Sequence, residues 1–219
     1  MSVREFEVIG DLTAVNRVTG DNERVQSAED RSQFVSQSQA PYLEIARQGI
    51  LWSVISVTGV VALVVRPSTL AIITLWNGES TQVGKSYIID RIFDHALIGT
   101  ASGVYGMWYT LHPAGMTKPS TALIAASATN IVGSTGKRYN GLAIVDAGHT
   151  VVDNGWYPIG PSGHTVTATT PGEQLEWKAE GRLIVPPQGG ISIQIVADVA
   201  GAGRHTPGLS WYEKAISLE

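Results

Sequence analysis

The stretch that comes nearest to a catalytic motif is GESTQVGKS, residues 78–86. A Walker A phosphate-binding loop has a glycine, four further residues and then Gly-Lys-Ser or Gly-Lys-Thr. Here five residues separate Gly78 from Gly84. The loop must also lead into a helix whose N-terminus faces the phosphates, whereas residues 87–97 fit a strand as well as a short helix. We therefore predict a type I′ turn at Asn77-Gly78, an ordinary loop lysine at Lys85, and no nucleotide site.

Two other patterns bear on hydrolysis. Asp90 and Asp94 are four residues apart, so they share a face of a helix or a side of a strand, as a pair of glycosidase carboxylates would. Residues 160–164 (GPSGH) approach the Gly-x-Ser-x-Gly nucleophile elbow, but the second glycine comes one residue early. The glutamates within 173–180 fit a solvated face. None of these patterns is complete, so we predict no catalytic residues and a protein that is not an enzyme.

Metal and cofactor sites are not indicated either. The chain has no cysteine, which excludes thiolate zinc sites and cysteine nucleophiles. It has five histidines, and none is spaced from another as metal ligands usually are. We interpret them as solvent-exposed or hydrogen-bonded loop histidines, and we predict no metal and no cofactor.

Three pairs of adjacent aromatic residues offer a different kind of site: Trp108-Tyr109, Trp156-Tyr157 and Trp211-Tyr212. Neighbours along a strand point to opposite faces, so one member of each pair should lie in the core and the other should face solvent or a partner. Exposed Trp and Tyr suit both sugar stacking and protein interfaces. We predict partner contacts at Trp108, Trp156 and Trp211, with packing in the core and at sheet edges as the alternative.

Composition limits the partners. The net charge is −4, so no basic field favours nucleic acid. Charged residues make up only 16% of the chain, against a usual quarter, which indicates a large core or much surface buried against partners. Residues 48–65 carry no charge over eighteen positions, near the lower limit for a membrane helix. Their valines and the central Thr58-Gly59 favour two short buried strands instead, so we predict no membrane contact.

The sequence predicts two parts. Residues 1–45 are polar and hold a Ser/Gln-rich run, and they have too few large apolar residues for a core of their own. They form an N-terminal arm, whose predicted partner contacts are Phe6, Val8, Phe34 and Tyr42. Residues 46–219 contain about ten short apolar or alternating runs separated by turn signals. We predict an all-β, jelly-roll-like antiparallel β-sandwich, and residues 181–197 are its best candidate hairpin.

The phrases LWNGES…GKSYIIDRIFDHAL and EGRLIVPPQGGISIQIVA resemble structural proteins of tailed-bacteriophage virions that have jelly-roll folds. The resemblance implies a capsid decoration (cement) protein, typically a trimer, that binds the major capsid protein or other virion proteins. It implies no catalytic residues and no cofactor. The expected location is the virion, assembled in the bacterial host cytoplasm, and the opening MSVREFEVIGD has no apolar signal segment. The alternatives are a tail or adaptor component, or a carbohydrate-binding β-sandwich module.

Overall fold

A computed structural model describes residues 49–56, 59–82, 84–97, 101–119, 141–165, 173–200 and 203–216, with Ala14–Val15, Asn22–Glu23, Ile45 and Thr129–Asn130. The chain divides into two compact units, Met1–Pro41 and Tyr42–Glu219. In the first unit, β1 (Ala14–Val15) pairs with β2 (Asn22–Glu23) in antiparallel fashion. All other described elements belong to the second unit.

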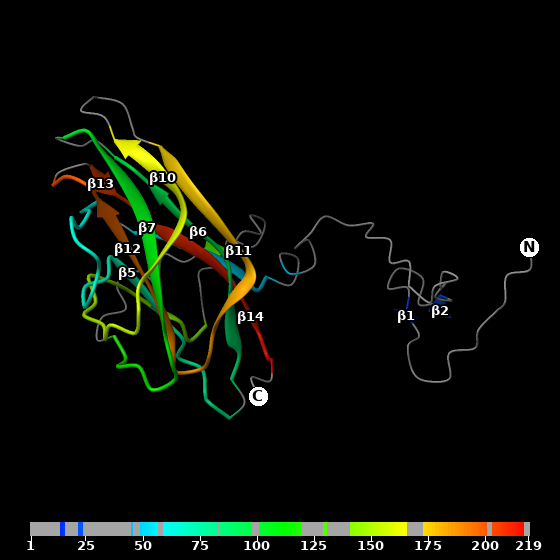
Figure 1. Cartoon of the computed structure of the whole chain (residues 1–219). Helices are drawn as coiled ribbons and strands as arrows, with labels where there is room; N and C mark the ends of the chain where they lie inside the picture. The colour runs from blue at the N-terminus through cyan, green and yellow to red at the C-terminus, as the bar shows by residue number, and fades with distance from the viewer. Residues whose placement is uncertain are drawn as a thin grey trace, which may run out of the picture. The chain divides into compact units, whose positions relative to one another are not determined.

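Two five-stranded antiparallel sheets make up most of the second unit (Figure 1). In spatial order, the first sheet contains β10 (Tyr157–Thr165), β7 (Gly103–His112), β12 (Gly190–Ala197), β5 (Ile73–Trp76) and β9 (Ile144–Ala147). The second contains β11 (Gln174–Val185), β6 (Ser86–His95), β14 (Gly208–Lys214), β3 (Leu51–Ile55) and β8 (Thr129–Asn130). A small ladder joins β4 (Val60–Val61) to β13 (Arg204–His205).

The strand order identifies the type of sandwich. Without the short edge strands β8 and β9, the sheets read β3-β14-β6-β11 and β5-β12-β7-β10. The chain passes from one sheet to the other at nearly every connection, and its first and last long strands, β3 and β14, lie side by side. This arrangement of two interlocked Greek keys is a jelly roll. The predicted fold class is therefore confirmed.

The core lies between the two sheets and explains the low charge content. Ile191, Ile193 and Ile195 alternate along β12, and all three are fully buried. On β7, the alternate residues Tyr105 and Met107 are likewise fully buried. One contiguous cluster of buried apolar residues contains these side chains and draws on both sheets, so the chain needs few charged residues on its inner faces.

The predicted hairpin at residues 181–197 is wrong. The two segments are strands, but β11 pairs with β6 in one sheet, whereas β12 pairs with β5 and β7 in the other. The turn through Pro186 to Gly189 therefore crosses between the sheets. Alternating apolar residues identify a half-buried strand, but they do not show which neighbour completes its hydrogen bonds.

Bulges explain two further differences from the sequence prediction. The register between β6 and β14 shifts at Asp90, so Asp90 has no partner on β14. As a result, Asp94 is buried while Asp90 is half-exposed. The GPSGH segment, which was not predicted to be a strand, belongs to β10 and spans a register shift between Ile159 and Gly163. It is therefore not the strand-to-helix turn of a nucleophile elbow.

The stretch of residues 48–65 contains the two predicted strands, β3 and β4. Most of β3 is buried as expected, but β4 is not, because Val61 is 49% exposed. No helix in the described part of the chain is long and apolar enough to span a membrane.

The opening motif is a turn and not a phosphate-binding loop. Lys85 is followed at once by β6, a ten-residue strand, so no helix N-terminus faces this segment. Lys85 Nζ lies 3.6 Å from Glu213 Oε2. Gly78 approaches the Leu142 carbonyl so closely that a Cβ would lie 2.2 Å from its oxygen. Neither Asn77 nor Gly78 has a positive φ, so the predicted type I′ geometry is wrong.

Asn77 holds this turn through its buried side-chain amide. The amide nitrogen donates to the carbonyl oxygens of Lys85 at 2.9 Å and Val185 at 3.1 Å. The amide oxygen accepts from the backbone N–H of Glu79 at 3.0 Å. A single side chain thus satisfies three backbone groups, in the turn after β5, immediately before β6 and at the end of β11, which is a structural role.

Candidate functional site

A buried polar row crosses the outer face of the first sheet. Residues of β7 alternate, so Tyr109 and Leu111 pack against the core while Thr110 and His112 face away from it. In register with Thr110 lie Ser192 on β12 and Thr74 on β5. All four outward-facing polar positions are buried. Polar side chains on an outer face would normally contact water, so their burial indicates that another part of the chain covers them.

Hydrogen bonds connect three members of the polar row, whereas the hydroxyl of the fourth, Thr110, has no hydrogen-bond partner among the described residues. Thr74 Oγ1 lies 2.8 Å from Ser192 Oγ, which in turn lies 2.9 Å from His112 Nε2. The Asn154 amide nitrogen lies 3.0 Å from His112 Nδ1. An amide N–H donates, so Nδ1 accepts, and Nε2–H then donates to the serine oxygen. This arrangement fixes His112 as one neutral tautomer.

A second histidine lies beside the first. His149 Nδ1 is 3.4 Å from Asp146 Oδ2, and the His149 side chain is 14% exposed. Its Nε2 atom is buried and has no hydrogen-bond partner among the described residues. The Asp146 carboxylate thus orients the ring, while the other nitrogen is left free to bind something else.

These two histidines line a cavity of about 320 Å³, which we call the histidine cavity. Its lining comes from the end of β7 and the residues after it, 112–117, and from residues 149–154, which precede β10. Its other lining residues are Pro113, Ala114, Gly115, Met116, Thr117, Thr150, Val151, Val152 and Asn154. The cavity is thus mainly apolar with a few polar groups, which is the usual composition of a small-molecule site.

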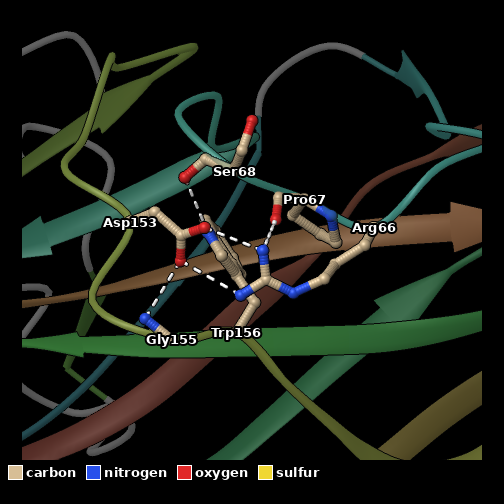
Figure 2. Close-up of polar contacts among 6 residues, drawn as sticks. All are labelled: Arg66, Pro67, Ser68, Asp153, Gly155 and Trp156. Carbon is tan, nitrogen blue, oxygen red and sulfur yellow. Dashed lines mark hydrogen bonds and ion pairs between the residues drawn. The ribbon is translucent and has the colours of Figure 1, made fainter.

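An ion pair braces the outer wall of the histidine cavity (Figure 2). Arg66 makes two hydrogen bonds to the Asp153 carboxylate, at 2.7 and 3.2 Å, and Asp153 Oδ1 also accepts from the Gly155 N–H at 3.0 Å. The hydrogen bond from Arg66 lowers the pKa of Asp153. The segment after residue 149 is therefore tied to residue 66, far away in the sequence.

Trp156 anchors the same segment from beneath (Figure 2). Its indole Nε1 donates to the Ser68 carbonyl at 2.9 Å. The ring is buried in a small second core with Ala71 and Val151, against which Trp108 and Met116 also pack. The wall is therefore held by packing and hydrogen bonds as well as by the ion pair, so the cavity is preformed.

Burial lowers the pKa of His112 from 6.5 to about 4, with a smaller contribution from the nearby His149. The unfolded chain therefore binds more protons than the folded chain between these two pH values, and stability falls as pH drops from 6.5 to 4. We expect a loss on the order of 2 kcal/mol across this window, after allowing for contact between the cavity and water. Urea unfolding at a series of pH values measures it.

The matched control for this pH dependence uses two glutamine variants. His112→Gln should flatten the fall in unfolding free energy below pH 6.5. His164→Gln, at an exposed histidine, should leave it unchanged. Each variant replaces one histidine by the same neutral residue, so the difference between their slopes isolates His112. Equal slopes for His112→Gln and the unmodified chain would contradict the assignment.

The connectivity of Ser192, His112 and Asn154 matches that of a nucleophile, a base and an orienting group. The environment of Ser192 does not match. Its side chain is fully buried and its hydroxyl is also bonded to Thr74, so a substrate carbonyl has no access to it. The arrangement therefore favours ligand binding in the cavity above the polar row, and not acyl transfer.

A second polar cluster is enclosed between the sheets. His205 Nδ1 lies 2.7 Å from Asp94 Oδ2, and both side chains are fully buried. The Tyr105 ring packs against the imidazole with centroids 4.5 Å apart. The Tyr105 hydroxyl donates to the Glu173 carbonyl at 2.8 Å, and burial raises its pKa. Because both side chains are fully buried, the role of this pair is structural. The spacing of Asp90 and Asp94 suggested a shared side of a strand, but the bulge at Asp90 separates them, so that Asp94 is buried while Asp90 is half-exposed.

The predicted partner-contact residues fall into three groups. Trp156 and Trp211 are buried within the chain, so the expectation of partner contacts there does not fit their positions. Trp108 is half-buried on the wall of the second core. Phe6, Val8, Phe34 and Tyr42 lie outside the described residues. Among the described aromatic residues, Tyr157 is the exposed one, at 60%.

Neither cavity histidine is signalled by the sequence, in which both fit loop histidines. His112 ends β7 and His149 follows β9, and the two are brought together by pairing through β12 and β5. No spacing in the sequence signals that contact. Among the described residues, no cluster of three or more His, Asp or Glu is placed to hold a metal ion.

Comparison with known proteins adds little. No protein-family model matches the sequence, and no curated protein matches it. Among solved structures, a chain from the cryo-EM structure of Mud Crab Dicistrovirus aligns with the whole of this chain and 92% of its own, at 10% sequence identity and a TM-score of 0.21. A TM-score at that level shows no common fold, so no conclusion about this protein rests on the likeness.

Proposed function

We propose that this chain is a non-enzymatic structural protein of a virion, and more specifically a trimeric capsid decoration protein. The observation that carries the proposal is the jelly-roll order β3-β14-β6-β11 and β5-β12-β7-β10. Viral capsid domains, lectins and cupins are the main users of this fold. Because a fold alone does not determine function, the interior and the surface must decide among them.

The interior argues against a cupin-like role. Where a cupin would hold its metal, this sandwich is filled by Tyr105, Met107 and the isoleucines of β12. The buried Asp94–His205 pair is enclosed and has no third ligand among the described residues. A filled, closed core fits a protein that acts through its outer surfaces and its arm.

The N-terminal region supports an assembly role. Residues 1–45 are polar, with the large apolar residues Phe6 and Phe34 far apart in the sequence. A segment of this composition gains order mainly by lying against another surface. Many such contacts made together stabilise a shell through multivalency, without any cofactor.

Light scattering on the full-length chain tests the proposal. We expect a mass three times the chain mass of 23.3 kDa. Full-length chain carrying Phe6→Ser and Phe34→Ser together should be monomeric, because the arm loses its apolar contacts. Val65→Ser, at an exposed valine of the sandwich, is the control and should stay trimeric. A monomer at every concentration for the unmodified chain would overturn the trimer.

A carbohydrate-binding module is the second candidate, and the surface of β10 favours it. Tyr157 is exposed, with its ring 6.1 Å from that of Tyr109. Tyr109 in turn stacks on Trp177 at 6.2 Å and an interplanar angle of 18°. A row of aromatic rings that ends at the surface can stack against a sugar ring. Glycan binding that is lost in Tyr157→Ala would favour this candidate.

A further inference from the structure

We propose that the histidine cavity binds a neutral, hydroxyl-bearing ligand about the size of one sugar ring. Its volume of about 320 Å³ is at the lower end of the range for small-molecule sites. This site goes beyond the structural role and does not depend on it, because every residue that lines the cavity belongs to the second unit.

The charge of the lining indicates a neutral ligand. The lining residues include no lysine, arginine, aspartate or glutamate. The carboxylate nearest to the site, Asp146, is engaged by His149, and Asp153 is paired with Arg66. His112 is held as a neutral tautomer by Asn154 and Ser192. A charged ligand would therefore lose its hydration without meeting an opposite charge.

The free ring nitrogen of His149 indicates that the ligand donates a hydrogen bond. A ring nitrogen beside a carboxylate carries the proton, so Nδ1–H points to Asp146 and Nε2 keeps its lone pair. That lone pair is buried and has no partner in the part of the chain that the structure describes. A ligand hydroxyl would satisfy it, and the same hydroxyl could accept from the exposed Asn154 amide at the rim.

The apolar walls suit the C–H face of a sugar ring. Pro113 and Met116 come from the segment after β7, and Val151 and Val152 come from the segment before β10. Both segments are fixed by backbone hydrogen bonds, from Gly115 N–H to Gln188 O at 3.0 Å and from Val151 N–H to Thr69 O at 2.8 Å. A preformed site of this kind spends little of its binding energy on ordering loops.

Two-dimensional ¹H–¹⁵N NMR on the full chain tests the proposal, with glucose, galactose and N-acetylglucosamine as probes. We expect saturable shifts in the backbone amides of Gly115 and Thr150, and in the imidazole signals of His149. His149→Phe removes the acceptor and should weaken binding about tenfold. Val152→Trp places a large ring at an exposed wall position, so the fold should be kept while the sugar is excluded.

Tyr157→Ala is the matched control, since it alters an exposed aromatic that does not line the cavity. Sugar shifts that persist in Tyr157→Ala and vanish in Val152→Trp support the cavity. Shifts that vanish in Tyr157→Ala and persist in His149→Phe would overturn it and favour the aromatic row. Absence of saturable shifts with all three sugars would also overturn it. Shifts of the His149 signals with Zn²⁺ but with none of the sugars would also overturn the proposal, because they would indicate that His149 is a metal ligand.

Discussion

Replacing Asp94 with leucine is expected to lower the free energy of unfolding by about 3–5 kcal/mol, because it leaves a buried His205 without its partner. Both side chains are fully buried, and 2.7 Å separates Nδ1 from Oδ2. The other two polar atoms, Asp94 Oδ1 and His205 Nε2, have no hydrogen-bond partner among the described residues. The interaction between these two residues therefore provides the main compensation for burying them. Urea unfolding of the full-length chain measures the loss.

The double variant Asp94→Leu/His205→Phe separates the pair from simple packing. A phenyl ring can keep the contact that His205 makes with Tyr105. Replacing a buried polar pair by apolar residues of similar size is often neutral or stabilising. The double variant should therefore recover most of the stability lost by either single variant. Losses that simply add would show that the two residues act independently.

An exposed ion pair provides the comparison. Arg91 and Glu176 lie 3.4 Å apart on neighbouring strands β6 and β11, and both side chains are well exposed. Water screens such a pair, so Glu176→Gln should cost less than about 1 kcal/mol. If Asp94→Leu and Glu176→Gln cost the same, the burial argument for Asp94 is wrong.

The strands were predictable where their local pattern is complete. The runs around Tyr105, Ile191 and Leu209 alternate, and each is a strand of the structure. Residues 157–165 were missed because proline and glycine interrupt the alternation there. The jelly-roll class followed from the number and spacing of such runs, and not from any knowledge of which strands pair.

The pairing and the site depend on contacts that are distant in sequence. Ser192 hydrogen-bonds to Thr74, 118 residues away, and to His112, 80 residues away. The hairpin prediction for residues 181–197 is wrong for the same reason, namely that pairing depends on strands distant in sequence. A turn that crosses between sheets has the same local composition as a turn within one sheet. The histidine cavity could therefore not be derived from spacing along the chain.

Truncation of Trp211 tests what the aromatic pairs do. Trp211 is fully buried, and its ring centroid lies 6.4 Å from that of Tyr87. Trp211→Ala should cost about 3–5 kcal/mol, through lost apolar burial and the cavity left behind. That loss is a large share of the 5–15 kcal/mol that stabilises a typical domain, so Trp211→Ala can leave the protein unfolded. Trp211→Phe removes less apolar area, and it should show a smaller loss of stability in a protein that stays folded.

The control for Trp211 is Tyr157, the exposed member of the pair Trp156-Tyr157. Tyr157→Ala removes a ring that is 60% exposed, so it should change the unfolding free energy by less than about 1 kcal/mol. Light scattering on both variants completes the test. If Trp211→Phe keeps its stability but changes the oligomeric mass, then Trp211 serves a subunit contact after all. If Trp211→Phe loses stability at an unchanged mass, then Trp211 belongs to the core. Partner contacts must in that case be sought at exposed residues such as Tyr157.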